Sequence, residues 1–483
     1  MADSQVTAQA PDLSSDVAQY VSKNLSPSGI VAVAKDGKIL SSKAWGDDGY
    51  DVTTPFRIAS LTKSFTALAV LSLRRAGLLG LDDEVVGHIP ELNVVAPSGW
   101  PALRIRHLLS MSGGIATDNP WGDRQEARTR AELSAWLAAG LRLTFPPGSS
   151  FEYANLGYAI LGEIVSRTSG QDYRQFVKDN ILDPLGLHDT RFAAEELAST
   201  ARGYHREPML PGQPGGWSHQ EPTGPGVFSP IGGLYSSVRD LVAWTNLYMT
   251  REVPAGTGFT AADLLEAQQP LTPLGAENAE APLHGLVQFG YGYGLIVEQY
   301  RDHGTFLAHS GGYPGFTAYM IWHPETRYAV IASANGTHSG VPSLAIDVIA
   351  DLVAKAERNR VKYEPWPETL AAAEKLTELI CQAPGANASE LAGRYAAAFA
   401  ENVEMDFPLV RRIEYLQQAL VSLGVPRAPS EKPDAERPAT AKWSIPAQHG
   451  KLDVRIEMTP VAPYTVQTFS VEVQNGARKV NLF

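Results

Sequence analysis

The segment 56–65, with the sequence FRIASLTKSF, constrains this chain more strongly than any other stretch. Apolar residues recur along it and after it at nearly helical spacing, as Leu61, Phe65, Leu68, Ala69 and Ala76. Gly77 follows at the position where glycine commonly caps the C-terminus of a helix. The pattern therefore predicts a helix with Ser60 in its first turn.

Ser60 and Lys63 have a spacing that suits nucleophilic chemistry. Unpaired backbone N–H groups and the helix dipole favour negative charge at the N-terminus of a helix. Residues three positions apart share one helix face, so the Lys63 amine can accept the proton of the Ser60 hydroxyl. The same spacing also occurs where the serine is a simple helix cap and the lysine is solvated. Other motifs have to decide between these two interpretations.

Composition limits the classes of protein that this chain can belong to. A length of 483 residues corresponds to roughly three domains, and 44% hydrophobic residues allow a sizeable core. The formal net charge of -12 argues against nucleic acid or an anionic membrane as a partner. Cys381 is the only cysteine, which excludes an intrachain disulfide and a multi-thiolate zinc site. Because His303, His323 and His338 lack partners at ligand spacing, we expect neither a metal nor a cofactor.

The sequence also lacks the pattern of a targeting or membrane-spanning segment. Residues 1–13 have no basic patch and no apolar core of signal-peptide length. No uninterrupted apolar run approaches the ~18 residues of a membrane span. We therefore expect a soluble, cytoplasmic protein.

Periodicity predicts an α+β fold. A β-hairpin is expected from 30–34 and 39–42, because the intervening Asp36-Gly37 suits a type I′ turn. Helical patterns then dominate, interrupted by a Pro- and Gly-rich stretch at 203–233 that reads as a long loop. Strands follow in close succession, which favours an antiparallel sheet, at 293–297, 305–312, 317–322 and 328–333. The apolar-faced helix predicted at 341–356 would pack on that sheet.

A domain boundary is predicted where charge and proline density rise, at 357–368. We therefore expect a first domain at 1–360 and a small accessory α+β domain at 361–483. Predicted elements of the second domain are helices at 370–379 and 409–423 and strands at 452–457 and 466–473. It would serve as a packing or oligomerisation partner, or as a wall of the substrate site.

Three motifs occur in an informative order: Ser60-x-x-Lys63, then Tyr153-x-Asn155, then His309-x-Gly311. In this order the chain resembles the class C β-lactamase and penicillin-binding-protein superfamily. Its non-lactamase members, which are esterases, D-aminopeptidases, carboxypeptidases and peptide cyclases, are the most similar. The similarity extends from Gly29 to about Ala356. It implies an antiparallel sheet flanked by helices, plus an all-helical lobe.

The resemblance implies a role for each matching residue. Ser60 corresponds to the nucleophile of an acyl-enzyme, and Lys63 to the partner that takes its proton, which requires a partly neutral amine. Tyr153 corresponds to the family's proton shuttle, and Asn155 to the residue that orients Lys63. The oxyanion donors would be the N–H groups of Ser60 and Gly312. Each donor in such a hole typically contributes about 3 kcal/mol of transition-state stabilisation.

His309 departs from the Lys-Thr-Gly motif of true β-lactamases. The family's esterases, aminopeptidases and cyclases commonly carry histidine at this position. A neutral imidazole is expected to donate to Tyr153 or to a substrate carboxylate, but it holds less fixed charge than lysine. The departure therefore argues against β-lactam hydrolysis and against a purely carboxylate-anchored carboxypeptidase.

Four further residues are candidate substrate contacts. Ser310 and Gly311 belong to the strand motif, so the resemblance implies that they line the substrate. Trp121 and Trp217 lie in two loops, although anchoring the loop is the more common role of such residues. Metal ligands are not expected among these residues.

Together these features predict a serine acyl-enzyme hydrolase or acyltransferase that acts on an amide or ester bond of a small peptide or carboxylic ester. One alternative is a penicillin-binding-protein-type thioesterase that releases and cyclises a nonribosomal peptide. A second alternative, from a different class, is an acylatable binding or sensor protein without turnover. The sequence leaves the exact substrate and the oligomeric state open.

Overall fold

The structure, a computed structural model, describes the chain except for short gaps. The described residues are 10–23, 25–207, 216–275, 285–301, 303–356, 364–429, 432–435, 437–475 and 478–483. The chain divides into two compact units, Met1–Arg358 and Asn359–Phe483.

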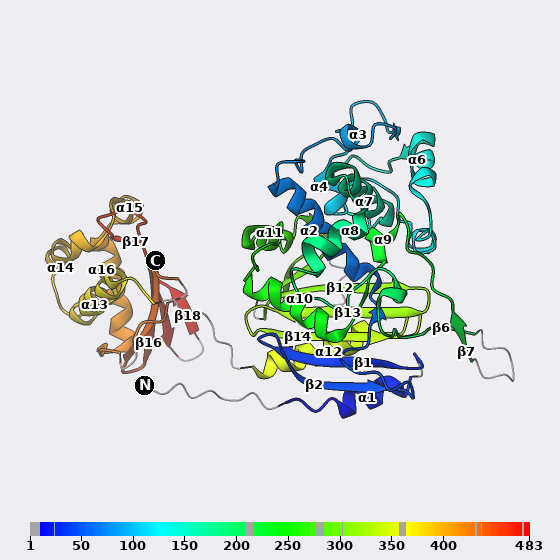
Figure 1. Ribbon diagram of the computed structural model, residues 1–483. Helices are drawn as coiled ribbons and strands as arrows, with labels where there is room; N and C mark the ends of the chain where they lie inside the picture. Colours follow the sequence, from blue (N-terminus) through cyan, green and yellow to red (C-terminus); the bar gives the residue numbers. More distant parts are fainter. Residues whose placement is uncertain are drawn as a thin grey trace. The chain divides into compact units, whose positions relative to one another are not determined.

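An antiparallel eight-stranded sheet forms the centre of the first unit (Figure 1). Its strand order is β2-β1-β14-β13-β12-β11-β10-β9, so the first strands of the chain lie beside a late one. The strands are β1 (Gly29–Lys35), β2 (Lys38–Trp45), β9 (Thr272–Pro273), β10 (Leu286–Tyr291), β11 (Ile296–Tyr300), β12 (Gly304–Tyr313), β13 (Phe316–His323) and β14 (Tyr328–Ala334). β13 and β14 are buried along their whole length, as expected for strands that are covered on both faces.

The predicted N-terminal hairpin is confirmed. β1 pairs with β2 in antiparallel register, and the turn between them places Asp36 and Gly37 at φ 51° and 73°. Positive φ at both central residues is the requirement of a type I′ turn, which aspartate and glycine meet at low cost.

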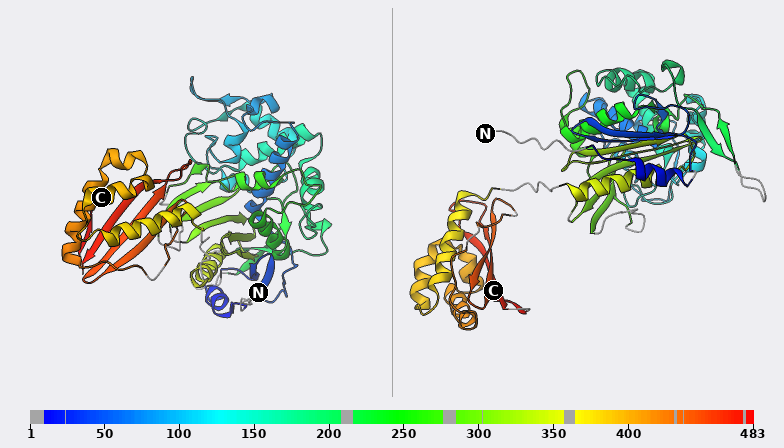
Figure 2. Two further views of the ribbon diagram at one scale, coloured as in Figure 1. Left: turned by 90° about the vertical axis from the view of Figure 1, so that its left-hand side faces the viewer. Right: turned by 90° about the horizontal axis from the view of Figure 1, so that it is seen from below.

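Helices cover both faces of the sheet (Figures 1 and 2). On one face lie α1 (Ser14–Val21) and α12 (Val341–Lys355), whose apolar residues share a core with Val31 and Val330. On the other face lies α10 (Val238–Thr250), in the larger core that also contains Ile30 and Ala32. Alternate residues of one strand thus enter two different cores.

A helical lobe stands on the α10 side of the sheet, with α2 buried inside it (Figure 1). Its helices are α2 (Thr62–Arg75), α3 (Val85–His88), α4 (Ile105–Leu109), α5 (Asn119–Gly122), α6 (Arg130–Ala139), α7 (Asn155–Ser169), α8 (Tyr173–Val177), α9 (Ser229–Gly232) and α11 (Ala261–Ala267). The unit also contains the 3₁₀ helices η1 (Ala59–Leu61) and η3 (Ala194–Glu196) and the π-helix η2 (Lys178–Leu182). Short strands pair as β3 (Phe56–Arg57) with β8 (Tyr235–Ser236), β4 (Val94–Val95) with β5 (Leu141–Arg142), and β6 (Gly203–Arg206) with β7 (Trp217–Gln220).

Two predictions for the first unit are wrong in part. The stretch 203–233 is not a continuous loop, since its described residues contain the β6–β7 hairpin and α9. The strand predicted at 293–297 begins only at Ile296. Gly294 has a left-handed φ of 72°, and a β-carbon there would lie 2.6 Å from the Lys63 carbonyl oxygen. The segment therefore crosses closely over α2 before it joins the sheet.

The second unit is a small α+β domain. Its elements are α13 (Pro367–Gln382), α14 (Ala388–Tyr395), η5 (Ala396–Ala398), α15 (Glu401–Asp406), α16 (Leu409–Leu423), β15 (Thr440–Ala447), β16 (Gly450–Met458), β17 (Val466–Asn475) and β18 (Arg478–Asn481). The four strands form one antiparallel sheet in chain order. The predicted helix at 409–423 and the two predicted strands are confirmed. β15, an edge strand that contains Pro446, was not predicted.

None of the helices within the described ranges is long and apolar enough to cross a membrane.

Candidate active site

Ser60 lies in a tight turn between two buried elements. The turn η1 follows β3 and leads directly into α2, so Ser60 precedes the first residue of that helix. Ala59 adopts φ 50°, a left-handed conformation that is costly for a residue with a β-carbon. Strain of this kind persists where the surroundings fix the backbone, and it clusters at functional sites.

The strand motif packs directly against this turn. A β-carbon on Gly311 would lie 2.3 Å from the Ile58 carbonyl oxygen and 3.2 Å from the Ala59 β-carbon. Only glycine therefore allows β12 to approach η1 this closely. Gly312 is exposed, and a β-carbon there would meet nothing within 4 Å. Gly312 thus borders open space beside the Ser60 turn.

Lys63 is fully buried and its amine has three hydrogen-bond partners. Nζ lies 3.0 Å from Ser60 Oγ, 2.8 Å from Asn155 Oδ1 and 2.7 Å from the Ile231 carbonyl oxygen. The carbonyl oxygen and the amide oxygen can only accept hydrogen bonds. A neutral amine would therefore direct its two hydrogens at Asn155 and Ile231, and its lone pair at Ser60 Oγ.

Burial lowers the pKa of Lys63 to about 7, although Asp123 and Asp118 oppose the shift by favouring the charged amine. Burial also raises the pKa of Asp123 to about 6, against the opposing effect of Lys63. Because the two groups interact, each titration step of the site belongs to the Lys63–Asp123 pair and not to one residue alone. Burial therefore favours the neutral form of the Lys63 amine.

Asp118 fixes the start of α7, which carries Asn155. Its carboxylate accepts hydrogen bonds from the backbone N–H groups of Asn155, at 2.7 Å, and Leu156, at 2.8 Å. These N–H groups belong to the first turn of α7 and lack partners within the helix. The Asn155 side chain also donates to Asn119 Oδ1 at 2.9 Å, which assigns its oxygen to Lys63. Asp118 therefore orients the side-chain amide of Asn155, and this amide in turn orients the Lys63 amine.

Tyr153 completes the cluster around Ser60. Burial raises its pKa well above the ordinary value, and a hydrogen bond with the Ser60 hydroxyl only partly offsets that effect. The Lys63 amine lies 5.0 Å from the centre of the Tyr153 ring. Burial therefore favours the neutral phenol of Tyr153 in the resting site.

The expectation for His309 is wrong in one respect. Nδ1 lies 2.7 Å from the Ser310 carbonyl oxygen, which can only accept, so Nδ1 carries the proton. Nε2 must then accept from the Tyr291 hydroxyl, 2.9 Å away. In this arrangement His309 cannot donate to Tyr153 or to a substrate carboxylate. Burial, assisted by Lys63, lowers its pKa to about 3, so the imidazole is neutral.

The two candidate tryptophans lie in different settings. Trp121 is 42% exposed and packs against Trp136 and Phe228, with ring centroids 5.2 Å and 5.8 Å away. It belongs to the segment that holds Asp118 and Asp123, so it borders the site. Trp217 lies on the β6–β7 hairpin, where the centre of its ring lies 6.0 Å from the guanidinium carbon of Arg206. Within the described residues, the structure does not bring Trp217 into the Ser60 cluster.

Four groups of this site escaped the sequence analysis: Asp118, Asp123, Tyr291 and the Ile231 carbonyl. Asp118 and Asp123 flank Trp121 in the chain, but no spacing rule connects a loop carboxylate to a lysine far away in sequence. Tyr291 ends β10, a strand that the periodicity did not reveal. Among the described residues, no group of three or more His, Cys, Asp or Glu side chains could hold a metal ion.

Fold and site together define a protein with a buried Ser-Lys-Tyr centre between a helical lobe and an antiparallel sheet. The chain belongs to the Beta-lactamase family, whose pattern matches residues 13–354. Members of this family are serine hydrolases. A similar curated protein is Protein flp of Staphylococcus aureus, 26% identical over 327 residues, 66% of this chain and 61% of that protein. The chain thus spans about three fifths of the length of that relative.

Solved structures with the same fold include three of interest. The octameric penicillin-binding protein homologue from Pyrococcus abyssi has a TM-score of 0.60 and 21% identity, covering 97% of this chain and 99% of the other. A D-stereospecific amidohydrolase from Streptomyces sp. has a TM-score of 0.57 and 20% identity, covering 70% and 98%. EstCE1, a hydrolase with promiscuous acyltransferase activity, has a TM-score of 0.56 and 21% identity, covering 70% and 97%. At these identities the likeness shows the fold alone.

Acylation of Ser60 is expected to rise with pH through about pH 6 to 7, because the Lys63 amine must be neutral to accept a proton. Asp123→Asn removes a negative charge that favours the protonated amine, so the rising limb should move to lower pH. The pH dependence of kcat/KM for both proteins tests this, with Asp179→Asn, an exposed carboxylate on η2, as the control. A profile flat from about pH 5 to 9, or a shift to higher pH, would contradict the assignment of Lys63 as base.

Proposed function

We propose that this chain is a serine acyl-enzyme hydrolase or acyltransferase that acts on the amide or ester bond of a small peptide or carboxylic ester. The observation that carries the proposal is the arrangement of Lys63, whose amine has two obligate acceptors and lies 3.0 Å from Ser60 Oγ. A neutral lysine held in this way is a base aimed at a serine hydroxyl.

Acylation would begin as Ser60 Oγ attacks the carbonyl carbon of the substrate and its proton passes to Lys63 Nζ. The carbonyl π electrons move to oxygen, which becomes an oxyanion. When the tetrahedral intermediate collapses, the carbonyl re-forms and the bond to the leaving group breaks. The Tyr153 hydroxyl gives its proton to the leaving alcohol or amine and recovers one from Lys63, which becomes neutral again. The product is an ester of Ser60.

Deacylation would reverse these proton movements. Tyr153 passes its proton to neutral Lys63 as it takes one from an incoming water, alcohol or amine, whose oxygen or nitrogen attacks the acyl carbon. The bond to Ser60 Oγ breaks, and Oγ regains its proton. Water as the acceptor gives hydrolysis, and another nucleophile gives acyl transfer.

Backbone N–H groups of Ser60 and Gly312 are proposed to bind the oxyanion. The close contact between Gly311 and η1 supports this role, because it holds the two segments side by side at a fixed separation. Preorganised donors need no rearrangement as charge develops, which is the reason such sites stabilise transition states.

The state of His309 supports the substrate class. Its Nε2 accepts from Tyr291, and its imidazole is neutral, so it offers neither charge nor a donor to a substrate carboxylate. Lysine at this position would supply both, as it does in true β-lactamases. Esters and amides without an anchoring carboxylate therefore fit this site better than β-lactams. The D-stereospecific amidohydrolase and the hydrolase with promiscuous acyltransferase activity among the similar folds are consistent with this class.

A steady-state comparison of three substrates tests the proposal. We expect turnover of p-nitrophenyl acetate and of a D-amino-acid p-nitroanilide, and poor turnover of nitrocefin. Nitrocefin hydrolysis that exceeds both others by orders of magnitude would contradict the substrate class. A stoichiometric burst without continuing release would instead indicate an acylatable binding protein. A peptide thioester that yields cyclic rather than linear product would identify the cyclase alternative.

A further inference from the structure

A buried ion pair lies directly behind the Ser60 turn. The side chains of Arg57 and Glu126 are 2% and 0% exposed and are joined by a short ion pair. The Arg57 guanidinium also stacks on Tyr313, 4.3 Å from the ring centre, and on Tyr235, 5.1 Å away. Burial alone would lower the pKa of Arg57, but Glu126 and the two tyrosines hold it above its ordinary value. Arg57 is therefore a permanent buried charge.

Glu126 is the centre of a network of hydrogen bonds. Tyr313 donates to Glu126 Oε2 at 2.7 Å, and Ser229 donates to Oε1 at 3.1 Å. Arg57 donates in turn to the carbonyl oxygens of Gly232, at 3.3 Å, and Thr223, at 3.1 Å. We refer to Arg57, Glu126, Thr223, Ser229, Gly232 and Tyr313 as the Glu126 network.

Three segments that this network joins carry groups of the Ser60 site. Arg57 precedes Ser60 by three positions, on the short strand that leads into η1. Ser229 opens α9, whose Ile231 carbonyl accepts the hydrogen bond of Lys63 Nζ. Tyr313 ends β12 and directly follows Gly312. One carboxylate thus joins the backbone of the nucleophile, the backbone that orients the base, and the strand that borders the open side of the site.

The enclosure of Glu126 leaves little room for it to move. A β-carbon on Gly224 would lie 2.2 Å from Glu126 Cγ, and one on Gly233 would lie 2.6 Å from Oε1. The 223–233 segment is therefore wrapped around the carboxylate at close range. A carboxylate that served only to neutralise Arg57 would not require this fitted enclosure.

We propose that Glu126 is a positioning residue, which sets the placement of the Ser60 turn, the Ile231 carbonyl and the Gly312 end of β12 relative to one another. The proposal rests on the proposed function of Ser60 and Lys63. Its first consequence concerns α9. If Ser229 loses its anchor, the Ile231 carbonyl moves away from Lys63 Nζ, and the charged amine loses an acceptor. The pKa of Lys63 then falls.

Other charged and titratable groups that face Lys63 are Asp118, Asp123, Tyr153, Tyr158 and His309. None of them is a member of the Glu126 network, but the charge of Glu126 contributes to the raised pKa of Asp123, so only variants that keep this charge leave their electrostatics as in the parent. Glu126→Gln also removes a charge, whereas Ser229→Ala removes only a hydroxyl. A fall in the Lys63 pKa in Ser229→Ala therefore reports the position of α9 rather than lost negative charge.

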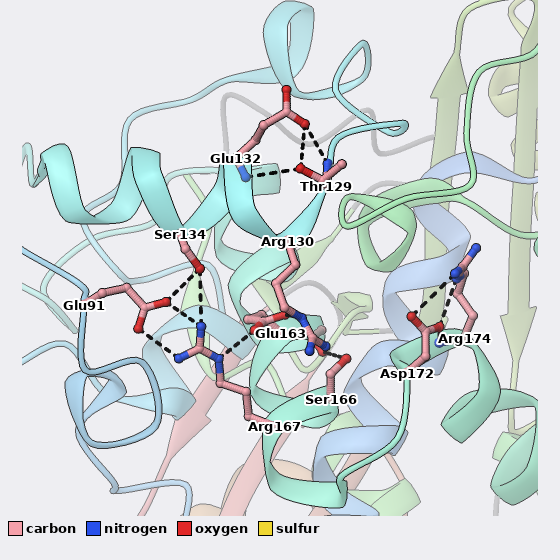
Figure 3. A network of polar contacts seen from close by, with 11 residues as sticks. Glu91, Thr129, Arg130, Glu132, Ser134, Glu163, Ser166, Arg167, Asp172 and Arg174 are labelled. Atoms are coloured by element: carbon pink, nitrogen blue, oxygen red, sulfur yellow. Dashed lines mark hydrogen bonds and ion pairs between the residues drawn. The ribbon is translucent and has the colours of Figure 1, made fainter.

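Glu163 provides a matched control (Figure 3). It lies on α7, its side chain is 2% exposed, and it pairs with Arg130 at 2.8 Å and Arg167 at 2.6 Å. Like Glu126 it is a buried carboxylate held by arginine, but none of these contacts is with the Ser60 turn, α9 or β12. Glu163→Gln should lower the melting temperature as Glu126→Gln does, without moving the titration of Lys63.

The test measures the parent, Glu126→Gln, Ser229→Ala, Tyr313→Phe and Glu163→Gln. We expect kcat/KM for p-nitrophenyl acetate to fall on the order of 10- to 100-fold in Glu126→Gln, mainly through kcat. The rising limb of the pH dependence of kcat/KM should move to lower pH in Glu126→Gln and Ser229→Ala. Tyr313→Phe should lower kcat without moving the rising limb of the pH dependence, because the Ser229 anchor of α9, and with it the Ile231 acceptor of Lys63, is kept. Glu163→Gln should have the same rate and the same pH dependence of kcat/KM as the parent.

Nuclear magnetic resonance of lysine labelled at 13Cε follows the Lys63 titration without any substrate. This readout separates the two proposals. A parent protein that a fluorophosphonate does not label would refute the acyl-enzyme function, while a lower Lys63 pKa in Ser229→Ala would still support the positioning role. A labelled parent with an unchanged Lys63 titration in both Glu126→Gln and Ser229→Ala would overturn the positioning role alone. Should Glu126→Gln not fold, Ser229→Ala and Tyr313→Phe decide the question.

Discussion

Ser60→Ala is expected to abolish turnover, with a loss on the order of 10⁶-fold, the scale seen when a catalytic nucleophile is removed. Among the described residues it is the Ser60 hydroxyl that lies 3.0 Å from Lys63 Nζ, and the lone pair of a neutral amine would be aimed at it. Folding should be nearly unaffected, since the change removes hydrogen bonds that contribute about 1 kcal/mol each. Steady-state release of p-nitrophenol and a thermal melt measure both effects.

A fluorophosphonate probe is the direct check on this expectation. It should label the parent at one site, and mass spectrometry should place the adduct on Ser60. Ser64→Ala is the control, because Ser64 lies on the same helix but donates to the Leu61 carbonyl oxygen and accepts from Trp244. Labelling that survives in Ser60→Ala would refute the assignment of the nucleophile.

Lys63→Met should lower the rate of acylation on the order of 10²- to 10⁴-fold, the usual contribution of a general base. Methionine approximates the shape of the lysine stem but has no lone pair on nitrogen and no N–H. The thermal stability should change less than the activity, because the amine is desolvated in the native state and its pKa is already lowered by burial. Single-turnover labelling with the fluorophosphonate measures acylation directly.

The matched control for Lys63→Met is Thr66→Val, one turn further along α2. Thr66 is also fully buried and also donates to a carbonyl oxygen of the α9 segment, that of Pro230, at 2.8 Å. Thr66→Val should cost stability and lower the rate much less than Lys63→Met does, because it removes one anchor of α9 but leaves the Lys63 amine in place. If Lys63→Met retained the parental rate, the proton acceptor of Ser60 would have to be another group.

The sequence allowed local features of the site to be predicted well. The three-residue spacing of Ser60 and Lys63 survives in the structure as a hydrogen bond, because helical geometry alone brings such residues together. The Asp36-Gly37 turn is equally local, and its type follows from the two residues themselves. The strands and flanking helix from β12 to α12 were visible as apolar runs because they are buried on one or both faces.

Long-range partners could not be obtained from patterns. Asn155 meets Lys63 across 92 positions, and only the resemblance to a family indicated that pairing. Tyr291 and Glu126 had no such guide, since neither belongs to a motif and each acts through the fold. The tautomer of His309 is likewise decided by Tyr291 and the Ser310 carbonyl, so the donor role expected for its imidazole could only be corrected once those partners were known.

The close contact between Gly311 and η1 fixes the separation between the Ser60 turn and Gly312. The two segments cannot move closer, because the backbone of β12 already touches the Ile58 carbonyl oxygen. The pairing of β12 with β13 resists their separation. An inhibitor that becomes tetrahedral when the serine oxygen adds to it, such as a boronic acid, should therefore bind with little adaptation of the protein. Any side chain at position 311 would collide with the Ile58 carbonyl oxygen, so even the methyl group of alanine would force β12 and η1 apart.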